Sequence, residues 1–289
     1  EGFKNNYNIL IKNINTDSNN SKKYKNSTDN KLVSIVEYNS SYPLKKQGTK
    51  YTDILKPKMS LKFSPNKTKN MRNEDRRIDI NNIFSMNRLS AKDTVEGGTS
   101  LTYGIDFLKT DKLSEKNLFE ANIANIFRFK EDKNLPRNSK LGDRTSDIVG
   151  GLNYNPNNIY KINYDFSIDN NLSETNYELL GSEFKINNFI TTFEYLNEKN
   201  TTGSESYLSN KTTYNMNKTS NLIFKIRENK KTKLTEFYNL IYEYTNDCLT
   251  AAIEYNKNYY NDRDLKPEEN IFFKLTIIPF GETSSPNLR

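Results

Sequence analysis

Few residues of this chain could carry out covalent or metal chemistry. Its 289 residues contain no histidine and a single cysteine, Cys248. Serine–histidine and cysteine–histidine catalytic pairs are therefore excluded, and so is any histidine metal site. We predict that the chain is not an enzyme and that it binds no metal and no cofactor.

A second group of candidate residues is the motif Glu96-Gly97-Gly98. Consecutive glycines permit a tight turn or a bulge between strands, because glycine adopts backbone conformations that other residues avoid. The carboxylate of Glu96 then has either a functional role or a simple place in the turn. We favour the turn.

The elements that must position these residues follow a period of two. In YKINYDFSID, residues 160 to 169, apolar and polar side chains alternate, which places them on opposite faces of a strand. The pattern recurs in LTYGIDF, FEANIANIFRF, IVGGLNY, FITTFEY, YNLIYEY, LTAAIEYNKNY and IFFKLTI, and more weakly near 5–14, 31–42, 52–63, 80–89, 174–186, 205–216 and 219–227. The sequence thus predicts an all-β antiparallel protein of roughly fifteen strands.

Two kinds of all-β protein remain open on this pattern. Many predicted strands reach about nine to eleven residues, the length of a tilted strand that crosses a bilayer. Their polar faces suit a hydrated lumen better than a dry core, which favours a transmembrane β-barrel over a soluble β-protein or a β-solenoid. The alternation makes four residues candidates for the lumen: Lys161, Asp165, Lys225 and Arg227.

Charge and chain ends add two expectations. The net charge is +7, but basic and acidic residues are mixed along the chain, so we expect no nucleic-acid partner. No apolar run is long enough for a transmembrane helix.

The first residue is Glu, and we expect the chain to be a C-terminal piece whose targeting signal lies upstream.

Two segments resemble one known family. INNIFSMNRLSAKDTVEGGTSLTYGIDF (80–107) and NDCLTAAIEYNKNYYNDRDLKPEENIFFKLTIIPFG (246–281) are similar to the C-terminal barrel of the LptD, or organic solvent tolerance, family of lipopolysaccharide-assembly proteins. The second resembles the alphaproteobacterial form, and SYPLKK (41–46) is a weaker match. The alternative is an outer-membrane porin or passive channel, which has no reason to carry these two segments.

The resemblance implies a role in the Gram-negative outer membrane. Family members receive lipopolysaccharide from an LptA-like periplasmic bridge and release it through a lateral gate, in a barrel plugged by an LptE-like lipoprotein. Family barrels have about twenty-six strands, near the upper end for outer-membrane barrels. We therefore expect residues 1–289 to be the C-terminal portion of such a barrel, without its periplasmic domain.

The resemblance also gives roles to residues near the C-terminus. It implies a disulfide between Cys248 and a cysteine of the periplasmic domain upstream of this chain. Only one such bond is expected, because Leu249 stands where the family often has a second cysteine. The strand at 270–280, expected to be the last, would line the lateral gate with Phe272, Phe273, Pro279 and Phe280.

Overall fold

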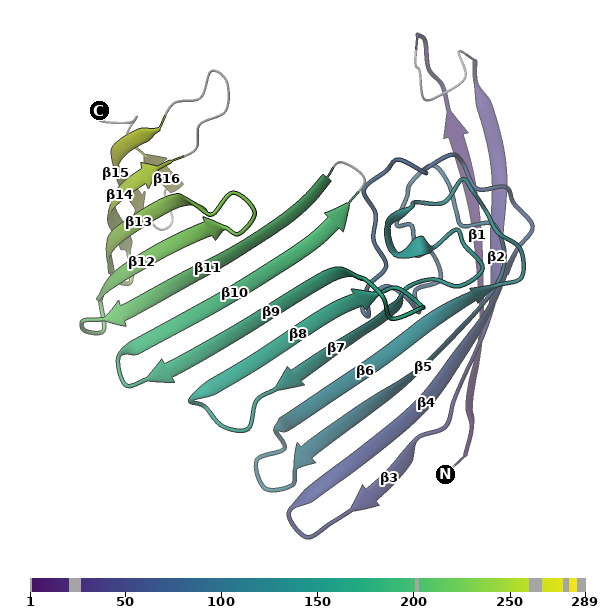
Figure 1. Ribbon diagram of the computed structural model, residues 1–289, viewed down its shortest axis with the longest axis horizontal. Helices are drawn as coiled ribbons and strands as arrows, with labels where there is room; N and C mark the ends of the chain where they lie inside the picture. Colours follow the sequence, from purple (N-terminus) through teal and green to yellow (C-terminus); the bar gives the residue numbers. More distant parts are fainter. Residues whose placement is uncertain (1, 21–26, 201–202, 260–266, 278–280, 285–289) are drawn as a thin grey trace. The chain divides into compact units, whose positions relative to one another are not determined.

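The structure is a computed structural model that describes residues 2–20, 27–200, 203–259, 267–277 and 281–284. Its regular secondary structure is almost entirely β-strand (Figure 1). Hydrogen bonds order them as one antiparallel sheet from β1 to β16 in sequence order, with the short β3 attached to β4 beside that path. The predicted all-β antiparallel fold is confirmed. Within the described residues, no helix has the length and apolarity needed to span a membrane.

The chain divides into two compact units. The first comprises Glu1–Asn153, Asp165–Tyr177 and Lys199–Gly203, and the second comprises Tyr154–Tyr164, Glu178–Glu198 and Ser204–Arg289. The strands and the one short 3-10 helix are β1 (Lys4–Thr16), β2 (Asp29–Ser41), β3 (Leu44–Gln47), β4 (Tyr51–Ser64), β5 (Gly98–Asp111), β6 (Asn117–Arg128), η1 (Asn138–Lys140), β7 (Ile148–Tyr154), β8 (Tyr160–Ile168), β9 (Thr175–Ile186), β10 (Phe189–Asn200), β11 (Gly203–Asn215), β12 (Ser220–Asn229), β13 (Leu234–Thr245), β14 (Leu249–Asn258), β15 (Glu268–Ile277) and β16 (Gly281–Ser284).

The strands expose their apolar face. In β4, Leu61 and Phe63 are 40% and 51% exposed, whereas Lys62 between them is 2% exposed. β5 repeats this arrangement, with exposed Tyr103 and buried Thr102. A soluble sheet buries its apolar side, so the inverted arrangement is typical of strands that face lipid.

The hydrophobic core of the first unit is built by two long loops rather than by a second sheet. Residues 65–97 join β4 to β5, and residues 129–147 join β6 to β7. They leave the same edge of the sheet, because two antiparallel strands separate them. Their apolar side chains pack with side chains of β6 and β7 in a cluster of Met71, Ile78, Ile83, Leu89, Ala91, Ala124, Ile126, Leu135, Leu141 and Val149.

One predicted strand is wrong. Residues 80–89, whose weak alternation indicated a strand, form successive turns inside the first loop. The carboxylate of Asp79 accepts hydrogen bonds from the backbone N–H groups of Asn81 and Asn82, which closes a turn where a strand would have to extend. Ile83 and Leu89 are buried in the core of the loops.

The end of the sheet also differs from expectation. The strand predicted at 270–280 is β15, but it is not the last described strand. Residues 281–284 form β16, which pairs antiparallel with β15 from Lys274 to Ile277. Pro279 and Phe280 lie outside the described residues.

Candidate functional site

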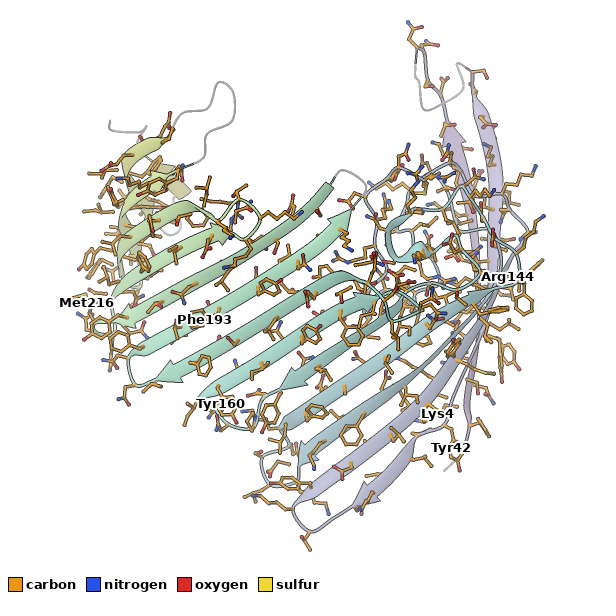
Figure 2. The ribbon with its side chains drawn as sticks, viewed as in Figure 1. Lys4, Tyr42, Arg144, Tyr160, Phe193 and Met216 are labelled. Atoms are coloured by element: carbon orange, nitrogen blue, oxygen red, sulfur yellow. The ribbon has the colours of Figure 1, made fainter. Side chains whose placement is uncertain are left out.

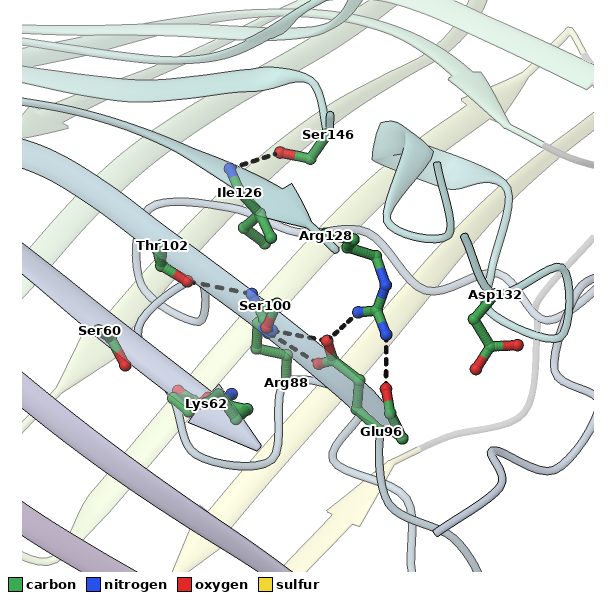
Figure 3. Close-up of polar contacts among 12 residues, drawn as sticks. Ser60, Lys62, Arg88, Glu96, Ser100, Thr102, Ile126, Arg128, Asp132 and Ser146 are labelled. Atoms are coloured by element: carbon green, nitrogen blue, oxygen red, sulfur yellow. Dashed lines mark hydrogen bonds and ion pairs between the residues drawn. The ribbon is translucent and has the colours of Figure 1, made fainter. Parts of the chain in front are cut away.

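The best-defined polar site lies where the first loop meets β5 and β6 (Figure 3). From the loop, the guanidinium of Arg88 donates to the carboxylate of Glu96, at 2.8 Å from Nε and 2.6 Å from Nη2. It also donates to the hydroxyls of Ser100 and Thr102 on β5, at 2.7 and 3.2 Å. Arg128, at the end of β6, pairs with the same carboxylate through Nη1. Arg88, Glu96 and Arg128 are 5%, 2% and 0% exposed.

Arg88, Glu96, Arg128 and the nearby Lys62 form an ionic cluster, whose electrostatics favour an ionised Glu96. Burial raises the pKa of Glu96, but the positive charges of Arg88, Lys62 and Arg128 outweigh that effect and lower the pKa to about 2. Lys62, on β4, also donates to the backbone carbonyl of Ser85 in the loop at 2.7 Å. The cluster therefore fastens one loop to three consecutive strands.

The two glycines after Glu96 permit this close packing. A Cβ atom at Gly97 would overlap the backbone carbonyl of Asn66, and the Gly97 carbonyl accepts a hydrogen bond from Arg128 Nη2 at 2.5 Å. Gly98 opens β5 with a φ of +83°, a conformation that favours glycine. The backbone N–H of Gly97 donates to Thr68 at 2.9 Å, so the two ends of the loop touch here. Glu96 is thus a buried ionic partner, and not the plain turn residue that we favoured.

Further contacts join the two loops to each other and to the strands. Thr68 donates to Asp132 at 2.6 Å, which links the first loop to the second. Asp165, one of the candidates for the lumen, lies on β8 and is half-buried, and Asp79 and Arg77 of the first loop are its charged neighbours. Asp165 therefore lies on the face that the loops cover.

The second unit presents the other three lumen candidates on its polar face. Lys161 pairs with Glu183 at 3.1 Å. Arg227 pairs with Glu236, and its guanidinium carbon lies 5.2 Å from the ring centre of Tyr207 and 5.5 Å from that of Phe237. Lys161 and Lys225 line a cleft of about 460 Å³. The apolar side chains between these positions, such as Leu222 and Phe224 of β12, point to the other face of the strands. Figure 2 draws the side chains along the strands.

The remaining predicted residues lie near the end of the second unit. Cys248 is exposed in the turn between β13 and β14, and its backbone N–H donates to the side chain of Asn246 at 3.0 Å. On β15, Phe273 is 44% exposed on the apolar face, whereas Phe272 is half-buried on the opposite face. Phe272 and Phe273 therefore lie on opposite faces of β15. The predicted disulfide stays a prediction.

The family assignment follows from a comparison with known families. Residues 6–217 match the family model described as "LptD: LPS transport system D", which is more than half of the chain. The chain belongs to the LptD family. The matched range contains the ionic cluster and the resembling segment at 80–107, whereas the segment at 246–281 lies beyond it. The family is one of transport proteins, and lipopolysaccharide is what its transport system carries.

Solved structures resemble this LptD-family chain only distantly. A mutant of the Rh. blastica porin is 9% identical, with a TM-score of 0.38, over 98% of this chain and 92% of the porin. The siderophore receptor PirA from Acinetobacter baumannii is 7% identical, with a TM-score of 0.41, over 95% of this chain and 53% of the receptor. A search of curated proteins gave no match. The assignment therefore rests on the family match.

Proposed function

We propose that this chain forms part of the wall of an outer-membrane translocon that inserts lipopolysaccharide into the outer leaflet. The observation that carries the proposal is the match to the LPS transport system D family over residues 6–217. The exposed apolar face of the strands supports it, because such a face suits lipid, and the polar face suits a hydrated passage for sugars.

The partners follow from the same proposal. An LptA-like periplasmic bridge would deliver lipopolysaccharide through a periplasmic domain upstream of residues 1–289. An LptE-like lipoprotein would fill the lumen, and Lys161, Asp165, Lys225 and Arg227 are the polar-face residues proposed to meet it or the lipid. The Gram-negative outer membrane would be the site of action.

Two finer features belong to the proposal. The strand β15, with Phe272 and Phe273, and the adjoining Pro279 and Phe280 would form one side of a lateral gate. Cys248 would form a disulfide with a cysteine of the periplasmic domain. Its exposure in a short turn supports this role, because a thiol must be accessible to be oxidised by a distant partner.

The proposal is tested by depletion of the full-length protein in its own cell. Newly made lipopolysaccharide should then fail to reach the outer leaflet, as measured with a label that reacts only at the cell surface. Re-expression of the wild-type protein should restore labelling. Normal surface lipopolysaccharide together with reduced uptake of small solutes would contradict the proposal and identify a passive porin instead.

A further inference from the structure

We infer that the polar face of the second unit carries a binding site for phosphate groups, built on Lys211 and Lys225. Both lysines line the cleft of about 460 Å³ described above. They lie directly opposite each other in the antiparallel pair of β11 and β12. The ligand class, a phosphorylated sugar headgroup, rests on the proposed function in lipopolysaccharide transport.

The register of the two strands makes this pair unusual. Directly opposed residues on one face of an antiparallel pair have Cβ atoms about 5 Å apart, and like charges there are destabilising. Two ammonium groups that extend from such positions can reach the same anion. A phosphate group, with up to two negative charges and several acceptor oxygens, offsets the repulsion that the empty pair carries.

Neighbouring carboxylates are already engaged elsewhere. Glu183 pairs with Lys161 at 3.1 Å, and Glu194 accepts a hydrogen bond from the hydroxyl of Tyr207 at 3.1 Å. The carboxylate of Glu236 is paired with Arg227. Within the described part of the chain, neither ammonium group of the lysine pair makes an ion pair or a hydrogen bond. Glu194 also lines the cleft and keeps its negative charge, since its partner is a neutral hydroxyl. Among the described residues, three lysines and two glutamates line the cleft, which leaves a net charge of +1 and two ammonium groups without an ion pair.

The same cleft supplies neutral groups for the rest of a phosphorylated headgroup. The hydroxyl of Ser209 lies on β11 two residues from Lys211, and the amide of Asn163 lines the cleft from β8. Hydroxyl and amide groups can donate to phosphate oxygens or accept from sugar hydroxyls. A hydrated, anionic headgroup therefore fits this surface better than an acyl chain does.

The test uses the full-length protein with its partners, purified in detergent, and a photo-crosslinking residue in place of Phe237, which lines the cleft. Lipopolysaccharide should form an adduct there on illumination, and chemically dephosphorylated lipopolysaccharide should form much less. The double variant Lys211→Gln/Lys225→Gln should lower the adduct about tenfold, the loss expected when a charge-assisted hydrogen bond is removed. Lys211→Arg/Lys225→Arg should retain the adduct.

The matched control is Lys218→Gln/Lys233→Gln, which removes the same charge from two exposed turns outside the cleft. It should leave the adduct unchanged, and the heat-dependent gel mobility of each variant checks that it is folded. The inference would be overturned if dephosphorylated lipopolysaccharide formed as much adduct as lipopolysaccharide does. It would also be overturned if the control variant lost as much adduct as Lys211→Gln/Lys225→Gln. Millimolar inorganic phosphate should reduce the adduct, because it offers the same charged oxygens to the two lysines. An adduct that inorganic phosphate leaves unchanged would count against a phosphate site.

The proposed function can fail independently of the phosphate site. Two measurements separate the phosphate site from the proposed function. The first compares the adduct at Phe237 with the adduct from a crosslinker in place of Leu240, on the apolar face. The second is surface labelling of lipopolysaccharide in cells. If lipopolysaccharide reaches the surface normally through the protein but no adduct forms at Phe237, the phosphate site alone is wrong. If depletion leaves surface lipopolysaccharide unchanged, the proposed function is wrong. The assignment of a lipopolysaccharide headgroup as the ligand of the site is then wrong as well.

Discussion

Arg88 and Glu96 form a two-point ion pair in the interior of the protein, with both guanidinium–carboxylate distances below 3 Å. Such a pair fixes orientation as well as distance, because the planar guanidinium matches the carboxylate. Arg128 reaches the same carboxylate from β6. Glu96 is therefore the common anion on which the attachment of the first loop depends.

Replacement of Glu96 by glutamine should strongly destabilise the protein. Glu96→Gln leaves the charges of Arg88 and Arg128 buried without their anion, and the loss of one partner from a buried ion pair costs about 3–5 kcal/mol. Urea unfolding of the full-length protein in detergent micelles measures the loss. Glu131→Gln, an exposed glutamate in the second loop, is the matched control and should unfold as the wild type does. Equal unfolding of both variants would contradict the structural role of the cluster.

Acid should remove the contribution of Glu96 to the stability of the folded protein only at low pH. The pKa of Glu96 falls from its ordinary value of 4.5 to about 2 in the folded protein. A depressed carboxylate pKa adds stability that is present above the unfolded value and is lost as pH falls through the folded value. The stability difference between wild type and Glu96→Gln should therefore be constant above about pH 5 and shrink between about pH 4.5 and pH 2. A stability difference between the two proteins that stays constant down to pH 2.5 would contradict this assignment of the Glu96 pKa.

Gly97 should not tolerate even one added carbon atom. In Gly97→Ala the new Cβ atom would overlap the backbone of Asn66, which cannot move aside as a flexible side chain could. Overpacking of this kind costs about 1–3 kcal/mol, and urea unfolding should show it. Gly2→Ala, at a position where a Cβ meets nothing within 4 Å, is the control. Wild-type stability of Gly97→Ala would show that the ends of the loop are not packed as described.

Most of the strands could be predicted from the sequence, because each strand keeps its apolar residues on one face. The period of two finds β8 and β14 from local residues alone. The same rule fails at 80–89, because the turn that Asp79 forms there depends on side-chain hydrogen bonds that alternation does not encode. The short β3 and β16 gave too few residues to show a period.

The ionic cluster was much less predictable than the strands. Alternation places Arg128 on the polar face of β6, but it does not connect Arg128 to Glu96, which is 32 residues away. Arg88 lies in the segment 80–89, whose weak alternation predicted a strand and gave no indication of a partner for its side chain. Long-range pairing of this kind follows from the fold of the loops and not from the local sequence.

The assignment of the two strand faces is tested by neighbouring residues of β13. Leu240 is 43% exposed on the apolar face, and Asn239 lies on the polar face, where its amide donates to Glu254 at 2.8 Å. Leu240→Arg should destabilise the protein in lipid by about 2–4 kcal/mol, the cost of an arginine that faces the middle of the bilayer. Asn239→Arg, its control, should be tolerated beside that carboxylate. A measurement of unfolding in liposomes that gave the reverse order would mean that the two faces are exchanged.

Oxidation state provides the test of Cys248. In the full-length protein isolated from cells with thiols blocked, Cys248 should resist a maleimide label until a reductant is added. Non-reducing gels should show a mobility shift that is lost in Cys248→Ser and kept in the nearby turn variant Asn246→Ala. Because Cys248 is the only cysteine of this chain and is exposed, its partner must come from elsewhere in the full-length protein or from another protein. Full labelling of Cys248 without reductant would mean that the thiol is free, and the proposed disulfide would then be wrong.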